Sequence, residues 1–261
     1  EASRQALGKS IANLLDLGEN EKITAFIPVA EFKEGQNLIM TTRKGTVKKT
    51  ELKAYSRPRK GGIIAITLDG DDELITVKKT DGSKQILIAT KNGMAIKFNE
   101  QDVRATGRSA KGVRGINLKN DDEVIDMVIG QDEKSLLTIT ENGYGKQTSI
   151  EEYRLIGRGG VGVKNIICSE RNGKVIAIKS LETNDEIMFI SRKGITIRTA
   201  ASGISVIGRA TQGMRLMRLS EGDKVVAAAK IISEETTPEN GNDETPPEDE
   251  STEEPAKDQS P

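Results

Sequence analysis

The chain has 261 residues, a formal net charge of −1 and only 3% aromatic residues, and it contains neither histidine nor tryptophan. The lack of histidine excludes an imidazole base or metal ligand, and a single cysteine, Cys168, excludes a disulfide within the chain and a cysteine-rich zinc site. No stretch approaches the roughly 18 apolar residues of a membrane span and the start lacks a signal-peptide pattern, so we expect a cytoplasmic protein with no membrane partner.

Residues 1–29 hold half of a repeating unit: the element Arg4-x-x-x-Gly8, an apolar segment, an acidic turn and a predicted strand, ITAFIPV. Because the chain starts without methionine and inside this unit, we expect it to be a fragment of a longer protein. Four fuller repeats follow, at about 37–80, 85–130, 135–180 and 186–232.

Each full repeat opens with two short predicted strands around a glycine turn. The Asn-Gly pairs at Asn92 and Asn142 predict tight hairpins with a two-residue turn in which both residues have positive φ. Lys44 and Lys193 precede glycine at the same place in their repeats. The four segments are LIMTTRKGTVKKT (38–50), ILIATKNGMAIKF (86–98), LLTITENGYGKQT (136–148) and IMFISRKGITIRT (187–199).

A polar loop with the Arg-x-x-x-Gly element follows each hairpin, and then come a third strand, a polar turn and a fourth strand. In the first full repeat the arginine spacing is altered, with Arg57 and Arg59 before Gly61-Gly62. The anchoring glycines lie 54, 50, 50 and 51 residues apart, at Gly8, Gly62, Gly112, Gly162 and Gly213. Four-stranded units at this period predict an all-β, propeller-like ring of blades. The chain lacks the tryptophan and aromatic patterns of WD and kelch blades.

The C-terminal segment from Ser233 contains 11 acidic residues and one lysine, which leaves residues 1–232 with a charge of +9. Its low apolar content and its prolines predict a disordered acidic tail over 233–261. Two interpretations stay open: the tail is a solubilising end, or it competes with whatever anion the basic body binds.

The acidic and glycine-rich motifs give no sign of catalysis. We interpret Asp71-Asp72-Glu73 and Asp121-Asp122-Glu123 as turn residues rather than metal ligands, because they recur at the same turn. The glycine pairs at Gly61 and Gly159 lack the Gly-Lys-Ser/Thr sequence and the helix of a nucleotide site. Gly8-Lys9-Ser10 has that triplet without the preceding strand and glycine. We therefore expect no catalytic site, metal or cofactor in this chain.

The basic residues recur in phase with the repeat, and in a ring such positions form a belt that suits a long polyanion. A solvated polar face is the alternative. Residues predicted to contact phosphates are Arg57, Arg59, Lys60, Arg108, Lys111, Arg114, Arg158, Lys164, Arg209 and Arg215. A second set at the hairpins comprises Arg43, Lys44, Lys48, Lys49, Lys91, Lys97, Lys146, Arg192, Lys193 and Arg198.

Duplex DNA fits this belt better than a single strand does. Proteins that bind single strands without sequence preference stack bases on aromatic side chains, and this chain has four Phe and three Tyr. Bending a 20–30 base-pair segment costs on the order of 1–6 kcal/mol, which several phosphate contacts could offset. We expect binding that is strong at low salt and weak at high salt.

Three motifs, GVRGI (112–116), ENGYGK (141–146) and IGRATQG (207–213), together with their hairpins, resemble the C-terminal domain of the A subunit of bacterial-type DNA gyrase. The resemblance covers about residues 1–232. It implies a β-pinwheel, a propeller-like ring with different strand connections, whose basic rim wraps DNA. It also implies a role in ATP-dependent negative supercoiling by an A2B2 assembly with the A-subunit catalytic core and the B subunit. ATP, Mg and the cleavage tyrosine would then belong to parts outside this chain.

The heptapeptide Gln-Arg-Arg-Gly-Gly-Lys-Gly that defines the gyrase domain does not occur intact. RQALGKS (4–10) keeps its Gly-Lys, and SRPRKGG (56–62) and IGRGGVG (156–162) are fainter relatives. Two alternatives stay open, and only the first follows from the missing heptapeptide. One is the equivalent domain of the topoisomerase IV A subunit, and the other is a propeller-like protein-interaction module, which would expose an apolar or aromatic patch.

Overall fold

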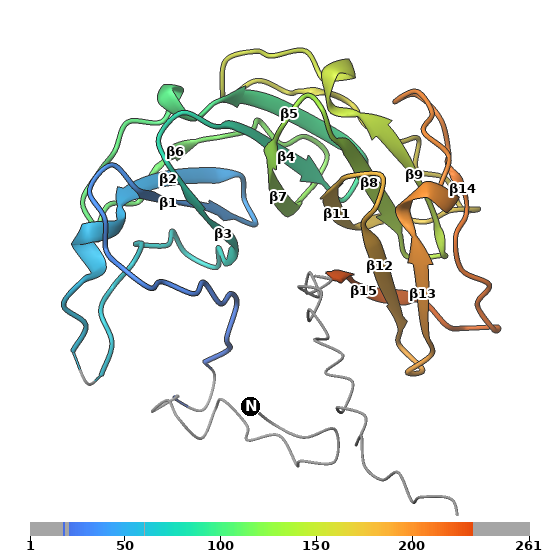
Figure 1. Ribbon diagram of the computed structural model, residues 1–261, viewed down its shortest axis with the longest axis horizontal. Coiled ribbons are helices and arrows are strands. Elements are labelled where there is room, and N and C mark those ends of the chain that lie inside the picture. Colours follow the sequence, from blue (N-terminus) through green and yellow to red (C-terminus); the bar gives the residue numbers. More distant parts are fainter. Residues whose placement is uncertain (1–17, 19–20, 60, 232–261) are drawn as a thin grey trace, which may run out of the picture. The chain divides into compact units, whose positions relative to one another are not determined.

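Short strands that alternate around glycine turns account for nearly all regular structure in the computed structural model, which describes residues 18, 21–59 and 61–231 (Figure 1). None of the helices among these residues has the length and hydrophobicity of a membrane span. Four short 3-10 helices follow hairpins: η2 (Leu52–Tyr55), η3 (Glu100–Asp102), η4 (Ile150–Glu152) and η5 (Ala201–Gly203).

The described strands form four antiparallel sheets, which we call A to D. Sheet A has the order β3-β1-β2-β6, sheet B β7-β4-β5-β10, sheet C β11-β8-β9-β14 and sheet D β15-β12-β13. The hairpins are β1 (Asn37–Thr42) with β2 (Thr46–Glu51), β4 (Gln85–Thr90) with β5 (Met94–Asn99), β8 (Ser135–Thr140) with β9 (Tyr144–Ser149), and β12 (Glu186–Ser191) with β13 (Thr196–Ala200). The last strands of the repeats are β3 (Leu74–Thr80), β7 (Val124–Gly130), β11 (Val175–Leu181) and β15 (Val225–Ile231), and each contacts the next.

The hairpin turns differ from the prediction. Strand β4 ends at Thr90 and β5 begins at Met94, so the loop between them has three residues, and Gly93 N–H donates to the Thr90 carbonyl at 3.1 Å. Only its glycine has positive φ, 86°, whereas Asn92 does not, and the turn at Asn142 is the same. The predicted two-residue turn was therefore wrong. Tertiary contact selects the observed form, because Asn92 N–H donates to the Asp122 carboxylate at 2.8 Å.

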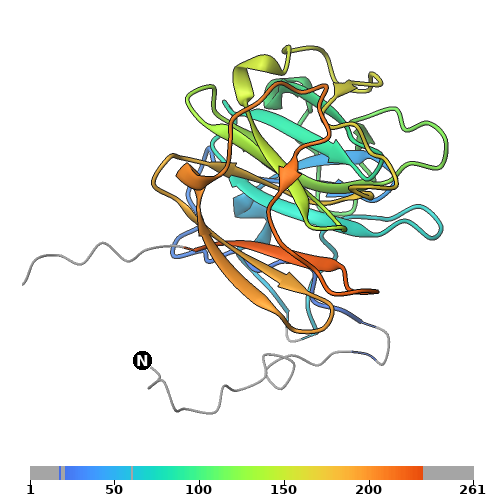
Figure 2. The same cartoon turned by 90° about the vertical axis from the view of Figure 1, so that its right-hand side faces the viewer.

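The third predicted strand of a repeat does not join the sheet of its own repeat. It is two residues long and pairs with the hairpin of the preceding repeat, as β6 (Val113–Arg114) on β2, β10 (Val163–Lys164) on β5 and β14 (Met214–Arg215) on β9. The orange loop of the last repeat reaches the yellow-green hairpin of sheet C in this way (Figure 2). We expected each repeat to form its own four-stranded sheet. Instead, sheets A, B and C each receive their fourth strand from the following repeat.

Two predicted strands are absent from the described part, each at a place where no hairpin is described for the strand to pair with. Residues 23–29 (ITAFIPV) form no strand, and the described residues of the half repeat include no hairpin with which they could pair. Residues 63–67 form none either, because no described hairpin precedes theirs. Residues 1–17 and 19–20 of the half repeat lie outside the described residues, and so does the predicted tail, 233–261.

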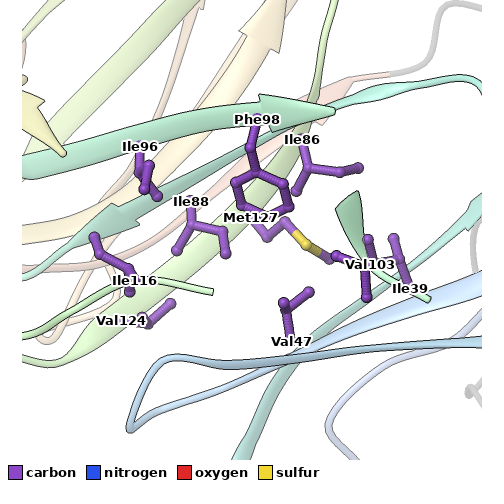
Figure 3. Packing of buried hydrophobic residues seen from close by; sticks show 10 residues of the cluster. All are labelled: Ile39, Val47, Ile86, Ile88, Ile96, Phe98, Val103, Ile116, Val124 and Met127. Carbon is purple, nitrogen blue, oxygen red and sulfur yellow. The ribbon is translucent and has the colours of Figure 1, made fainter. Parts of the chain in front are cut away.

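The core lies between successive sheets, so a central strand is apolar on both faces. Ile86 and Ile88 of β4 pack toward sheet A, with Val47 and Met127 in the same cluster (Figure 3). Leu87, the residue between them, packs toward sheet C in a second cluster. The period of two along a strand explains this division, and it explains the nearly continuous apolar runs in the hairpins. A third cluster joins sheets C and D.

Candidate nucleic-acid interface

The loops that follow the hairpins lie side by side at the sheet edge opposite β3, β7 and β11, and we call the surface that they form the rim. The rim loops are residues 56–73 (residue 60 not being described), 103–121, 153–172 and 204–222. Backbone hydrogen bonds join an N–H of each loop to a carbonyl of the next: Thr67 to Ala110 (3.3 Å), Asn117 to Gly160 (2.8 Å) and Ile167 to Thr211 (2.9 Å). Equivalent residues of successive repeats therefore recur along one surface.

Glycine is required where a rim loop crosses the preceding hairpin. Gly162 has φ +79°, and a Cβ there would lie 2.3 Å from the Ala95 carbonyl oxygen. Gly112 and Gly213 are equally confined. Gly62, with the same φ, has no atom within 4 Å of such a Cβ among the described residues. The repeated glycine thus permits the close contact between repeats, and at Gly62 no neighbouring repeat is described.

The arginine of the Arg-x-x-x-Gly element joins adjacent rim loops. In each case a guanidinium Nη1 donates to the carbonyl of the residue two positions after the preceding anchoring glycine: Arg108 to Ile64 (3.3 Å), Arg158 to Arg114 (3.1 Å) and Arg209 to Lys164 (3.1 Å). Part of the hydrogen-bonding capacity of these three predicted phosphate ligands is therefore used within the protein. Arg108 and Arg209 are half-buried, whereas Arg158 is exposed.

A second group of predicted ligands faces outward. Arg114, Lys164 and Arg215 are the second residues of β6, β10 and β14, and all three are exposed. Because these strands are equivalent, the structure places one cation at the same point on the rim of sheets A, B and C. Within the described residues, none of the three forms an ion pair.

The remaining predicted ligands lie on the first two rim loops. Arg57 and Arg59 are exposed, and Lys60 lies outside the described residues. Lys111 is exposed and forms an ion pair with Asp69. Lys111 and Arg114 line a surface hollow that also contains Lys44. The surface around the first two rim loops is therefore partly neutralised, since Lys44 is also paired, with Asp71.

Four of the hairpin cations are not on the surface, which corrects their assignment to the belt. Lys48, Lys49, Lys97 and Lys146 are at most 8% exposed. The Nζ of Lys146 donates to the carbonyls of Gly208 (2.6 Å) and Arg209 (2.7 Å) in the next repeat. The physical reason is the register of the hairpin, which points these side chains at backbone carbonyls of the neighbouring loops and 3-10 helices rather than at water.

Lys48 and Lys146 occupy equivalent places and share an unusual electrostatic setting. Lys48 Nζ donates to the carbonyls of Ala65 (2.8 Å) and Arg108 (3.0 Å). Burial, and then the nearby Arg108 charge, lowers the pKa of Lys48 to about 8. Burial, opposed by the Glu152 charge and aided by a smaller effect of Arg209, lowers the pKa of Lys146 to about 8 as well. These lysines hold repeats together at the cost of a partly desolvated charge.

The acidic turns have a structural explanation. Asp122 Oδ1 accepts from the N–H groups of Asn92 (2.8 Å) and Glu123 (2.9 Å), so it fixes the hairpin tip against the turn. Asp72 and Asp223 do the same for their hairpins. In the described part of the chain, no group of three or more Asp, Glu, Cys or His side chains could hold a metal ion.

Sequence reasoning missed three exposed rim arginines, Arg104, Arg154 and Arg171. Arg104 and Arg154 follow equivalent buried residues, Val103 and Tyr153, and an alignment of the repeats would have identified them. Arg171 lies in a turn where the two preceding repeats have aspartates. A comparison of the repeats would have identified it by this change from negative to positive charge.

Comparison with known proteins gives consistent results. A profile of the family described as "DNA gyrase C-terminal domain, beta-propeller" matches residues 1–30, 36–81, 84–130, 134–181 and 185–231. The A subunit of DNA gyrase from Buchnera aphidicola subsp. Acyrthosiphon pisum is 55% identical over 232 residues, which cover 89% of this chain and 28% of that protein. The gyrase A protein of Salmonella typhimurium is 44% identical over 231 residues, which cover 88% and 26%. The chain thus spans about a quarter of the length of these relatives.

Two solved structures share the fold. The C-terminal domain of a DNA topoisomerase IV superposes with a TM-score of 0.81 at 28% identity, covering 87% of this chain and 71% of that one. A DNA gyrase A C-terminal domain gives a TM-score of 0.78 at 27% identity, covering 86% and 75%. The strand exchange between repeats therefore belongs to a β-pinwheel.

Proposed function

Because the chain belongs to the family of DNA gyrase C-terminal domains, we propose that it binds, bends and wraps duplex DNA along the rim. The observation that carries this proposal is the equivalence of Arg114, Lys164 and Arg215, three exposed cations on strands that succeed one another along the rim. A duplex following them would meet phosphate ligands at regular intervals. Such contacts carry no sequence information, so the binding is sequence-tolerant.

The placement of the aromatic residues favours duplex over single-stranded DNA. Phe98, Phe189 and Tyr153 are fully buried, and Tyr144 is 6% exposed. Stacking of unpaired bases needs exposed aromatic faces, and these four rings are used in the core or against arginines. Phe26 and Phe32 are exposed, but they precede β1 and lie outside the rim loops, so on the rim phosphate contact through arginine and lysine is the means of binding.

In the longer protein, we propose that this domain presents wrapped DNA to the A-subunit catalytic core and the B subunit of an A2B2 gyrase in the cytoplasm. Negative supercoiling would use ATP and Mg bound in those other parts. The fragment would bind DNA without catalysing a reaction. The equivalent domain of topoisomerase IV is the alternative, because no intact gyrase heptapeptide is present and a topoisomerase IV domain shares the fold.

Affinity measured across a salt series tests the proposal. The full chain is titrated into a labelled duplex and into a single strand of the same length, by fluorescence anisotropy. We expect tighter binding to the duplex and a steep linear fall of log affinity with log salt. Absence of duplex binding at low salt would overturn the proposal and favour a protein-interaction module, for which the exposed Ile64 and Val206 on the rim would be the first candidates.

A further inference from the structure

Three side chains from separate segments meet at the hairpin-turn end of sheet C. Tyr144 is the first residue of β9, Arg215 is its pairing partner on β14, and Arg171 lies in the turn before β11. Arg215 Nη2 donates to the Tyr144 hydroxyl oxygen at 2.8 Å. The guanidinium carbons of Arg171 and Arg215 lie 4.9 and 5.4 Å from the centre of the Tyr144 ring. Two cations thus surround one phenol.

In the part of the chain that the structure describes, no carboxylate forms an ion pair with this cluster. Among the described residues neither Arg171 nor Arg215 forms an ion pair, although many other surface cations do. Both guanidiniums, Arg171 first, lower the pKa of Tyr144 below its usual value. Adjacent cations repel each other, and an anion bound beside both would relieve that repulsion.

The sequence departs from its own repeat at this position. Asp71 and Asp121 occupy the place of Arg171 in the two preceding repeats, relative to the turn residues Asp72, Asp122 and Asn172. In the first full repeat the acid neutralises a cation of the hairpin turn, since Asp71 pairs with Lys44. In the third repeat the same position adds a cation to the rim. The charge at this position is thus positive instead of negative in the repeat where Arg215 lies nearby.

The cluster is also held rigidly. Asn172 is fully buried, and its Nδ2 donates to the carbonyls of Ile167 and Gln212, each at 2.9 Å. This side chain ties the turn that carries Arg171 to the segment that carries Arg215. Fixed donors lose less conformational entropy when a ligand binds than mobile lysines do.

We infer that Arg171, Tyr144 and Arg215 form a binding site for a backbone phosphate of duplex DNA, built into the rim of sheet C. The two guanidiniums supply charge and N–H donors. The phenol oxygen accepts from Arg215, so its own proton can be donated to a phosphate oxygen. The inference rests on the proposed function and adds two residues, Tyr144 and Arg171, to the DNA contacts predicted from the sequence.

The test uses the full chain, a short duplex and the variants R171D, R171Q and Y144F. R171D restores the residue type of the preceding repeats and should lower duplex affinity about tenfold, with the salt slope reduced by about one. R171Q should give a smaller loss with the same change of slope. Y144F should weaken binding about threefold without changing the slope, because no charge is lost. K79D, on β3 at the opposite sheet edge, is the matched control and should bind as wild type.

Fluorine NMR of fluorotyrosine-labelled protein reports on the site itself. The three tyrosine resonances are assigned with single Phe variants. Duplex should shift the Tyr144 resonance in wild type but not in R171D, and the buried Tyr153 serves as the reference. If wild type binds duplex while folded R171D keeps its affinity and salt slope, the phosphate site is wrong and the proposed function stands. If wild type binds no duplex, the proposed function fails first.

Discussion

Arg158 donates through Nη1 to the carbonyl oxygen of Arg114 at 3.1 Å, which makes two neighbouring rim arginines different in role. Arg158 Nε also donates to the Asp102 carbonyl at 2.8 Å, so its guanidinium joins three segments. The side chain of Arg114 donates no hydrogen bond to any described residue. One arginine holds the repeats together, and the other is available to a ligand.

This contrast predicts separable effects of two equal charge losses. R158Q should lower the free energy of unfolding by about 1 kcal/mol, because hydrogen bonds between repeats are lost. R114Q should leave stability within about 0.5 kcal/mol of wild type and weaken DNA binding. Urea unfolding and duplex titration of both variants measure the two effects. A destabilised R114Q and an unaffected R158Q would reverse the assignment.

The equivalence of Arg114, Lys164 and Arg215 predicts an additive loss of phosphate contacts. The triple variant R114Q/K164Q/R215Q should reduce the slope of log affinity against log salt by roughly 2–3. K78Q/K79Q/K230Q removes three charges from β3 and β15 at the other edge and should keep the wild-type slope. Equal loss in the two variants would mean that net charge, rather than position on the rim, determines binding.

The repeated glycine predicts a difference between two chemically identical substitutions. G162A and G62A both place a Cβ on a backbone with φ +79°, which costs about 1 kcal/mol in either case. Only G162A also brings that Cβ against a neighbouring carbonyl, at 2.3 Å, and should cost roughly 1–3 kcal/mol more. Denaturant midpoints provide the comparison. Equal destabilisation would show that contact between repeats does not require glycine at residue 162.

The buried Lys146 predicts that the stability of the fold rises with pH, because its pKa is lowered. A lysine whose pKa is raised by an ion pair would have the opposite effect. The unfolded chain keeps the proton on Lys146 up to about pH 10.5, whereas the fold releases it at about 8. Between these values the unfolded state binds more protons, so raising the pH favours the fold. The melting temperature of wild type relative to K146M should therefore rise between about pH 7 and pH 10. A constant difference would contradict the lowered pKa.

The sequence predicts much of this fold, because hairpins and last strands have strong local patterns. The apolar run at 86–90 indicates a strand that is buried on both faces, and the glycine period reveals the repeat. Strand exchange has no such signal, because Val113–Arg114 is two residues long and pairs with Thr46–Val47 far away in the chain. The predicted boundary between ring and tail at residue 232 stays a prediction.

The candidate site was harder to predict because residue type does not report burial. Lys44 and Lys48 are both hairpin lysines, yet Lys44 is exposed and Lys48 is 1% exposed. The difference depends on which carbonyls the neighbouring repeat presents, which only the assembled structure shows. Arg171 was not predicted for a related reason, because its position beside Arg215 is apparent only in the folded structure. The ten phosphate contacts predicted from the sequence remain predictions.

Bending of bound DNA tests the central claim most directly. A linear duplex of about 100 base pairs, long enough to curve along several repeats, carries a donor and an acceptor dye at its ends. Energy transfer is followed as the full chain is added at low salt, with the R114Q/K164Q/R215Q variant beside it. Wrapping along the rim predicts that wild type brings the ends together and that the triple variant does so less at equal occupancy. Saturable binding that leaves the ends as far apart as in free DNA would contradict it.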